Sequence, residues 1–324
     1  MSPEPTPHTI DATEAGERLD KWLAAPTRLG SRKKAAEALE RGKIFLNGDR
    51  QEVRNGGRLL EAGDRVGLWI DRPGTAKPSG LRAGGAALQA LGELEVLHDD
   101  AELIVVNKPA GLLTVPRNGA EGEDDTVVAR LEQALDRKQR RRLYIVHRID
   151  RWTTGLVVVA RTVEAQEILR EQFFRRTPER SYKAIAHGLF AEAERAWEDE
   201  LFADEQTRVQ RRARAGEEGV EARSRFRVVE RFGDRATLLA VDLDTGKRNQ
   251  IRVQAALRGH PLVGERLYRS KRIEEPIKFP RQALHAERLR FDHPKSGETI
   301  EFRAPFPADL KKLVTRLRRE AKSS

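Results

Sequence analysis

An aspartate set between arginines offers the clearest chemistry in this chain. Asp150 lies two residues after Arg148 and directly before Arg151, between two strand-like runs at residues 143–146 and 156–160. The sequence predicts that a tight turn separates the carboxylate from the second run, through Thr153, Thr154 and Gly155. An ionised carboxylate can act as a base or a nucleophile, yet an aspartate in such a place more often only forms the turn. The neighbouring residues alone leave both interpretations open.

Three separated stretches resemble one enzyme family in the same order. Residues 147–156 resemble the H-R-L-D-x-x-T-S-G-L signature of the RluA-type pseudouridine synthases, which isomerise uridine in structured RNA. Residues 180–184 resemble the family's basic-x-Tyr-x-Ala strand. Residues 245–253, followed by 259–264, resemble T-G-R-T-H-Q-I-R-V and G-H-P-I-V-G-D-x-x-Y, and residues 107–112 match as well. Several matches in this order argue against coincidence.

The resemblance implies a reaction in which the uracil–ribose bond breaks, the base turns and a carbon–carbon bond forms from carbon 5. It makes Asp150 the essential carboxylate, a nucleophile or base, and leaves the microscopic step open. It pairs Arg252 with this carboxylate, and a guanidinium can grip a carboxylate through two hydrogen bonds. It makes Tyr182 the ring that stacks on the base, because a phenol has a flat apolar face and a polar tip. The alternative for Arg252 is an exposed arginine on a helix, and the alternative for Tyr182 is a tyrosine packed in the core.

The same resemblance predicts residues that contact the substrate, namely Arg148, Thr153, Gly155 and Gln250. Extruding a stacked uridine costs a few kcal/mol, and Arg148 would fill the gap that the nucleotide leaves. A salt bridge at the strand end is the alternative for this arginine. His147 is expected to have a structural hydrogen-bonding role. The chain has no cysteine, and its seven histidines show no metal-ligand spacing, so we expect neither a metal nor a cofactor.

The chain departs from the family pattern at three positions. Thr154 replaces a serine, Lys247 an arginine and Asn249 a histidine. These changes leave the three predicted catalytic residues in place, so they bear on the substrate more than on activity. Trp152 lies in a variable position and could contact RNA or simply pack.

Residues 15–71 predict a compact module of two helices followed by a small sheet. Leu19, Trp22 and Leu23 share one helix face, Ser31 suits the N-cap of a second helix through Arg41, and the Asn-Gly pair at 47–48 predicts a hairpin. The module resembles the S-four RNA-binding module, first recognised in a small-subunit ribosomal protein. Cations at a helix N-terminus would meet phosphate there, although a solvated helix end is the alternative. The predicted RNA-binding residues are Arg18, Lys21, Arg32, Lys33, Lys34 and Lys43.

The rest of the chain predicts a second, larger domain. Residues 1–14 are expected to be a flexible tail, and the Pro- and Gly-containing residues 72–90 a flexible linker. Mixed strands and helices over 91–310 predict an α+β catalytic domain with a mixed, largely antiparallel sheet and flanking helices. Residues 311–324 form a basic segment whose spacing predicts an amphipathic helix.

Composition agrees with an RNA partner. The 324 residues carry 61 Lys and Arg against 51 Asp and Glu, a net charge of +10. Such an excess suits a polyanion, most plausibly ribosomal RNA and otherwise transfer RNA, although it also suits any highly charged protein. Basic clusters at 137–142, 208–214 and 311–322 could line an RNA path. Without a secretory signal or an apolar run of membrane-spanning length, we expect a cytoplasmic monomer that binds no membrane.

Two other classes of protein compete with an RNA pseudouridine synthase. One is a catalytically inactive RNA-binding or ribosome-assembly protein on the same fold. The other is a DNA-binding regulator built on the small module, which would leave the larger domain unexplained. An Asp–Arg pair enclosed in a cleft would favour the enzyme.

Overall fold

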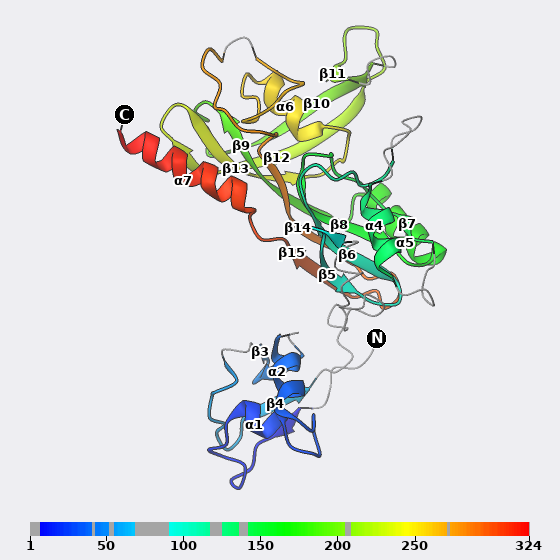
Figure 1. The fold of residues 1–324 in the computed structure, drawn as a ribbon, viewed down its shortest axis with the longest axis vertical. Coiled ribbons are helices and arrows are strands. Elements are labelled where there is room, and N and C mark those ends of the chain that lie inside the picture. The colour runs from blue at the N-terminus through cyan, green and yellow to red at the C-terminus, as the bar shows by residue number, and fades with distance from the viewer. Residues whose placement is uncertain are drawn as a thin grey trace. The chain divides into compact units, whose positions relative to one another are not determined.

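The computed structural model consists of two compact units, Met1–Ser79 with Ser296–Glu298, and Gly80–Lys295 with Thr299–Ser324 (Figure 1). It describes residues 7–40, 43–51, 55–68, 91–116, 125–135, 142–204, 209–270 and 273–323. The expected linker at 72–90 lies outside these ranges. Among the described helices, none is both long and apolar enough to cross a bilayer.

The first unit is a four-stranded antiparallel sheet with two helices. The strand order is β1-β4-β2-β3. The bounds are β1 His8–Thr9, α1 Leu19–Leu23, α2 Arg32–Glu40, β2 Ile44–Leu46, β3 Asp49–Arg50 and β4 Arg65–Leu68. One buried cluster joins the helices to the sheet, because Leu19, Trp22 and Leu23 of α1 pack with Leu39, Ile44 and Val66. The predicted helix face is therefore the face that α1 buries.

Local signals in this unit act as the sequence predicts, with one difference at the start. Asn47 and Gly48 have φ values of 53° and 91°, as the hairpin turn requires, and the Ser31 hydroxyl accepts the amide of Lys34 at 3.2 Å. The expected helix end at 41–42 lies outside the described residues. The start differs because β1 pairs with β4 and Ile10 is buried, so residues 8–14 belong to the fold and not to a flexible tail.

The second unit is built on one large, mostly antiparallel sheet. The order is β11-β10-β12-β13-β9-β14-β8-β6-β5, with β15 beside β14 and β7 beside β8. The strand bounds are β5 Glu95–Asp99, β6 Leu103–Lys108, β7 Tyr144–Ile145, β8 Thr154–Ala160, β9 Glu179–His187, β10 Glu194–Ala203, β11 Gln210–Arg212, β12 Val220–Phe232, β13 Ala236–Leu243, β14 Leu284–Asp292 and β15 Thr299–Arg303. Among the described strand pairs, only β14 with β8 is parallel. The expected α+β class is thus confirmed.

Two helices enclose one half of this sheet. These are α4, Val127–Ala134, and α5, Val163–Arg175, and each is N-capped by a threonine hydroxyl, of Thr126 and of Thr162. Alternate residues of β8 pack into two separate cores, Val157 and Val159 with α4, and Leu156 and Val158 with α5. All seven residues of β8 are buried for this reason, which is why the strand is apolar throughout.

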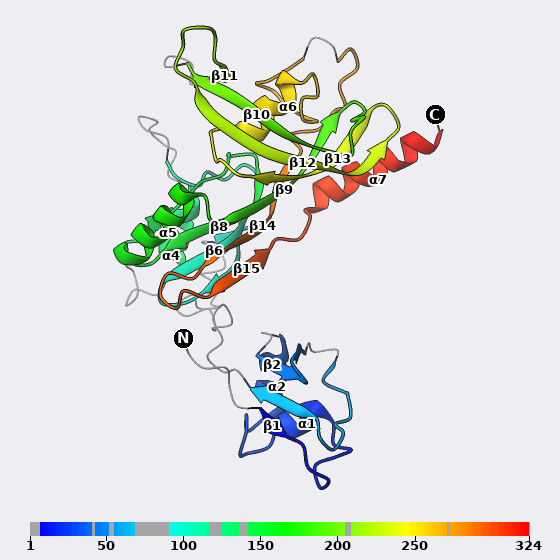
Figure 2. The same ribbon diagram turned by 180° about the vertical axis from the view of Figure 1, so that it is seen from behind.

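The other half is enclosed in the same way by α6, Gln250–Leu257, and α7, Ala308–Ser323 (Figure 1, Figure 2). Ile251 and Ala255 of α6 pack on one face of β9 and β13. The predicted apolar stripe of α7, which is Leu310, Leu313, Val314 and Leu317, packs on the other face. The basic C-terminal segment is therefore an amphipathic helix docked on the sheet.

Some boundaries of helices and strands agree with the sequence expectation and others differ from it. β13 and α6 begin and end where the apolar pattern predicts, but β8 begins at Thr154, so the turn spans Asp150–Thr153. Neither β10 nor β15 is expected from the sequence. β10 is rich in Glu and Ala, and its inward positions include a buried Asp199, which weakens the apolar alternation that marks a strand.

A close approach between β8 and β14 makes Gly155 a structural requirement. Its φ is +112°, and an added Cβ would lie 2.1 Å from the carbonyl oxygen of Ala286. We expect Gly155→Ala to lower the free energy of unfolding by about 3 kcal/mol or more, measured by urea unfolding. Gly216→Ala is the matched control, because φ is +84° there and no atom lies within 4 Å of the added carbon. Gly216→Ala should lower the free energy of unfolding by about 1–2 kcal/mol. An equal loss of stability in the two variants would contradict the close approach at Gly155.

Candidate active site

A buried lysine fixes the turn that carries Asp150. The turn closes with the amide of Thr153 donating to the Asp150 carbonyl at 3.0 Å. Lys108, at the end of β6, donates through Nζ to the carbonyls of Pro109, Leu112 and Arg151 at 2.8–2.9 Å. These three acceptors match the three N–H donors of an ammonium. Burial lowers the pKa of Lys108 to about 7, while the nearby Asp150 carboxylate favours the charged form.

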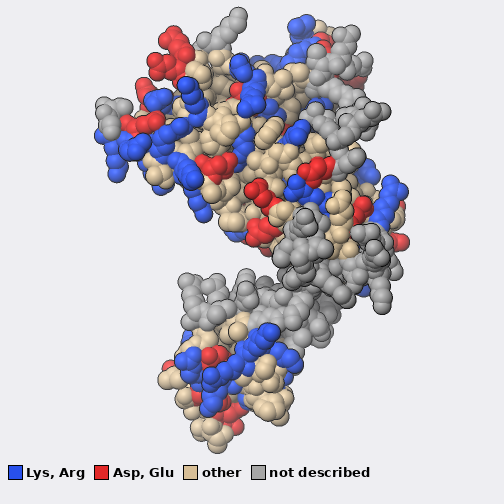
Figure 3. All heavy atoms as spheres, in the orientation of Figure 1, with Lys and Arg blue, Asp and Glu red and all other residues tan. Residues whose placement is uncertain are grey.

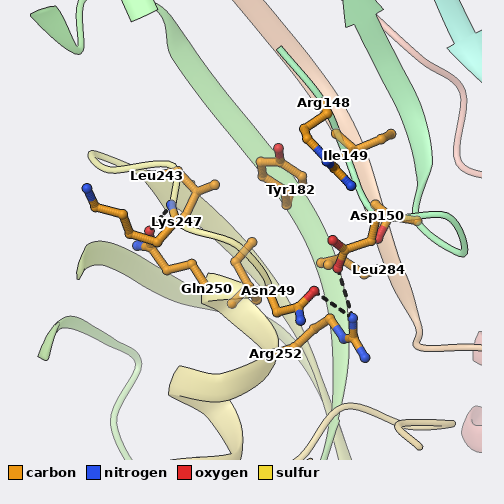
Figure 4. A pocket seen from close by; sticks show the side chains of 12 residues that line it. Arg148, Ile149, Asp150, Tyr182, Leu243, Lys247, Asn249, Gln250, Arg252 and Leu284 are labelled. Atoms are coloured by element: carbon orange, nitrogen blue, oxygen red, sulfur yellow. Dashed lines mark hydrogen bonds and ion pairs between the residues drawn. The ribbon is translucent and has the colours of Figure 1, made fainter. Parts of the chain in front are cut away.

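Arg252 of α6 lies between the carboxylates of Asp150 and Glu265, and Figure 4 shows its contacts with Asp150 and Asn249. Its Nε and Nη2 each donate to Glu265 at 2.7 Å, and its Nη1 donates to Asp150 at 3.0 Å and to Asn249 at 2.9 Å. Glu265 therefore occupies one edge of the guanidinium and leaves the remaining nitrogen for Asp150. This is the paired geometry that the resemblance predicts, and Glu265 and Asn249 are additions to it.

Arg252 and its two carboxylate partners are partly or fully enclosed. Glu265 is 1% exposed, Arg252 11% and Asp150 25%. Burial would raise the pKa of Glu265, but the bonds from Arg252 hold it below its usual value. Burial would lower the pKa of Arg252, but Glu265 and Asp150 raise it above its usual value. The guanidinium thus stays charged and fixed, and the most exposed of the three groups is the carboxylate of Asp150.

Tyr182 faces the same cleft from β9 (Figure 4). The cleft is open to solvent. Its lining residues are Arg148, Ile149, Asp150, Thr153, Tyr182, Leu243, Lys247, Asn249, Gln250, Ile251, Arg252 and Leu284. Burial raises the pKa of Tyr182, so the phenol keeps its proton at neutral pH. The carboxyl group of Asp150 and a neutral phenol ring thus border one cavity.

Arg148 is the exposed cation of the cleft. Its side chain lines the cavity and has no hydrogen bond or ion pair within the described part of the chain. His147, one residue earlier, accepts the Val158 amide through Nε2 at 3.1 Å and stacks on Phe173. Burial lowers the pKa of His147 to about 3, so it is neutral there, in agreement with the expected structural role.

Of the other residues expected at the substrate, Thr153 and Gln250 line the cleft and Gly155 does not. Thr153 is buried and accepts a hydrogen bond from Gln282 at 3.3 Å. Gln250 is buried, and its carboxamide oxygen accepts from the Thr245 hydroxyl and from the Lys247 amide. Gly155 is not among the lining residues and lies against β14. The polar atoms of Gln250 are thus used within the protein.

The predicted RNA-binding residues belong to the first unit and precede the residues of the cleft in the sequence. Arg18 pairs with Asp20, and Lys21 with Glu17. Exposed cations fill the first turn of α2, namely Arg32, Lys33 and Lys34, and Lys43 precedes β2. No three His, Asp or Glu side chains gather as metal ligands would in the part of the chain that the structure describes.

Two residues of the site were missed by the sequence prediction. Lys108 lies in a stretch that matches the family, but its role depends on carbonyls up to 43 residues away. Glu265 directly follows the 259–264 match, where an acidic residue near an arginine motif could have served as a signal.

Comparisons with known proteins agree with the geometry. A family model described as RNA pseudouridylate synthase matches residues 102–257. The uncharacterized RNA pseudouridine synthase YlyB of Bacillus subtilis is 32% identical over 96% of this chain and 97% of its own. The ribosomal large subunit pseudouridine synthase D of Xanthomonas campestris is 33% identical, over 96% and 92%. The solved human RNA pseudouridylate synthase domain containing 4 shares the fold, with a TM-score of 0.58 and 20% identity over 72% of this chain and 97% of that chain.

Removing the ammonium of Lys108 tests whether it supports the turn. Lys108→Met would remove the ammonium donor from the carbonyls of Pro109 and Leu112 and one of the two donors to the Arg151 carbonyl, so we expect the free energy of unfolding to fall by about 3 kcal/mol or more in urea titrations. Lys183→Met is the matched control, because Lys183 is part-exposed and pairs only with Glu287 at 3.5 Å. It should cost under about 1 kcal/mol. A neutral or stabilising Lys108→Met would mean that the cost of burying the charge outweighs its bonds.

Proposed function

The chain belongs to the RluA-type family of RNA pseudouridine synthases, and from this premise we propose that it isomerises specific uridines in structured ribosomal RNA. The observation that carries the proposal is the Asp150–Arg252 contact of 3.0 Å at a cleft that Tyr182 also lines. The ribosomal large subunit synthases among the relatives support ribosomal RNA as the substrate. Transfer RNA is the second candidate. A ribosomal RNA substrate agrees with a cytoplasmic location, where we propose that the protein acts as a monomer.

The proposed chemistry assigns one role to each group of the site. Asp150 acts as nucleophile or base while the uracil–ribose bond breaks and the base turns. Arg252, held by Glu265, orients the carboxylate through its hydrogen bond. Tyr182 stacks on the free base and lies near carbon 5, whose proton must leave when the new bond forms. Uridine and pseudouridine are isomers, so the reaction requires no electron acceptor or co-substrate.

Access of the base to Asp150 requires that the uridine leave its stack. That step costs a few kcal/mol. The exposed guanidinium of Arg148 at the cleft supports a role in filling the vacated position and bonding to neighbouring bases. The chemistry and the extrusion of the nucleotide would then depend on residues only two apart in the chain.

RNA outside the cleft would be held by cationic surfaces. In the first unit, Arg32, Lys33 and Lys34 lie at a helix N-terminus whose amides also attract phosphate. In the second unit, Lys and Arg gather on the side of the molecule where α7 lies (Figure 3), with Lys311, Lys312, Arg319 and Lys322 exposed on that helix. Most of the basic cluster at 137–142 lies outside the described residues. Binding that depends on phosphate contacts weakens steeply with salt.

An inactive RNA-binding protein is the alternative function. Such a protein would need no charged pair with a buried second carboxylate behind it, because enclosing charges is costly without a compensating use. A DNA-binding regulator would use the first unit and leave the cleft unexplained. The open cleft beside Asp150 therefore favours the enzyme.

The first test is the loss of a modified base. RNA from cells lacking the protein should miss one or more pseudouridines, detected as carbodiimide-dependent reverse-transcription stops. The wild-type protein should restore them in the cells, and the Asp150→Ala variant should not. With purified protein, Asp150→Ala should lower the single-turnover rate by about 10²–10⁴-fold or more, because the reacting group is gone. Restoration by Asp150→Ala, or no missing site, would contradict the proposal.

The second test separates RNA binding from isomerisation. Lys33→Glu combined with Lys34→Glu should weaken RNA binding and reduce the slope of log affinity against log salt by about 2, one for each phosphate that is no longer neutralised. The isomerisation rate on saturating RNA should not change. Asp150→Ala is the complementary control, with an unchanged salt slope and no isomerisation. An unchanged slope in the double variant would remove these lysines from RNA binding.

A further inference from the structure

The segment directly before β14 contacts both sides of the Asp150–Arg252 pair. Its residues are 281–283, and the side chain of Arg281, its first residue, is only 2% exposed. Neither Arg281 nor Gln282 is among the residues that line the cleft. Their contacts reach the backbone of the turn that carries Asp150 and the hydroxyl of Thr153.

One set of contacts reaches the turn that carries Asp150. Arg281 donates through Nη1 to the carbonyl of Trp152 at 3.2 Å. Gln282 donates through Nε2 to the hydroxyl of Thr153 at 3.3 Å. These bonds hold the second half of the Asp150–Thr153 turn, while Lys108 holds the Arg151 carbonyl from the other side.

A second set of contacts reaches the loop that carries Glu265. The amide of Ala283 donates to the carbonyl of Val263 at 2.8 Å. Gly264 has a φ of +75°, and a Cβ there would lie 2.0 Å from the carbonyl oxygen of Arg281. The loop is therefore pressed against the segment, and its next residue is Glu265, which grips Arg252. One short segment thus adjoins the supports of both members of the ion pair.

The segment is itself anchored to α7. Asp309, at the start of that helix, accepts Nε and Nη2 of Arg281 at 2.7 and 3.0 Å. Arg281 therefore uses all three of its nitrogens, and its Nη1 also reaches the carbonyls of Gln282 and Leu284. A lysine could not make this fork and the turn contact together, because its ammonium is a single point of donation.

We propose that Arg281 and Gln282 are positioning residues that set the separation of Asp150 from Arg252, with Asp309 of α7 as the brace. The proposal rests on the proposed function for its rate effect. Because neither side chain lines the cleft, their removal should leave RNA affinity unchanged and slow the chemical step. A displacement of about 1 Å in reacting groups can cost about 10²-fold in rate.

The test compares two arginines in the same kind of pair. Arg281→Met is the test variant, and Arg161→Met is the matched control, since Arg161 is 12% exposed and pairs with the buried Asp99 at the opposite end of β8. Both changes should lower the melting temperature. Only Arg281→Met should lower the single-turnover rate on saturating RNA, by at least about tenfold, with the RNA dissociation constant within about twofold of wild type. Equal rates in the two variants, or a rate loss matched by a loss of affinity, would overturn the proposal.

A milder variant keeps the proposal testable if Arg281→Met does not fold. Gln282→Met removes only the bond to Thr153, and we expect a rate loss of about threefold to tenfold at unchanged RNA affinity. An unchanged rate in this variant would remove Gln282 from positioning.

A readout that needs no activity separates this inference from the proposed function. Amide hydrogen exchange of a peptide covering residues 150–154 should be faster in Arg281→Met, or in Gln282→Met if the first does not fold, and unchanged in Arg161→Met. Faster exchange with an inactive wild-type protein would leave the positioning role standing and reject the proposed function. Unchanged exchange in the test variant would reject the positioning role, whatever the activity.

Discussion

One guanidinium shared by two carboxylates is the interaction on which the site depends. Arg252 is almost enclosed, so its charge would be costly without partners, and Glu265 supplies one that is itself buried. Glu265 takes two nitrogens and fixes the plane of the group, which leaves Nη1 aimed at Asp150. Lys108 supports the same turn through its hydrogen bond to the Arg151 carbonyl. The carboxylate of Asp150 is the least enclosed of the three paired groups, which suits a group that must meet a substrate.

The fold assembles this interaction from distant parts of the chain. Asp150 comes from the turn between β7 and β8, Tyr182 from β9, and Arg252 from α6, 102 residues after Asp150. The sheet joins these elements because β14 pairs with β8 on one side and with β9 on the other. Helices on both faces of each half make the sheet a rigid base for the turn that carries Asp150 and for Tyr182 and Arg252.

Covering both faces also separates chemistry from binding. The cleft lies on the side of the sheet where Tyr182 packs with the α4 and α6 cores, whereas α7 covers the opposite face. The exposed cations Lys311, Lys312 and Lys322 of α7 therefore lie on the face opposite the cleft. Under the proposed function, phosphate contacts there would set affinity while the enclosed groups set the rate.

The sequence by itself determined the elements whose signals are local. The bounds of β13 and α6, the Asn47–Gly48 hairpin and the apolar stripe of α7 follow from periodicity and turn chemistry within a few residues. The resemblance supplied Asp150, Tyr182 and Arg252. Only the tertiary structure decided that Glu265 grips Arg252, that Lys108 holds three carbonyls, and that Gly155 must lie against β14. These roles depend on contacts between residues that are far apart in the chain. The hydrophobic periodicity or motif of one stretch does not specify which distant residue will lie against it in the folded protein.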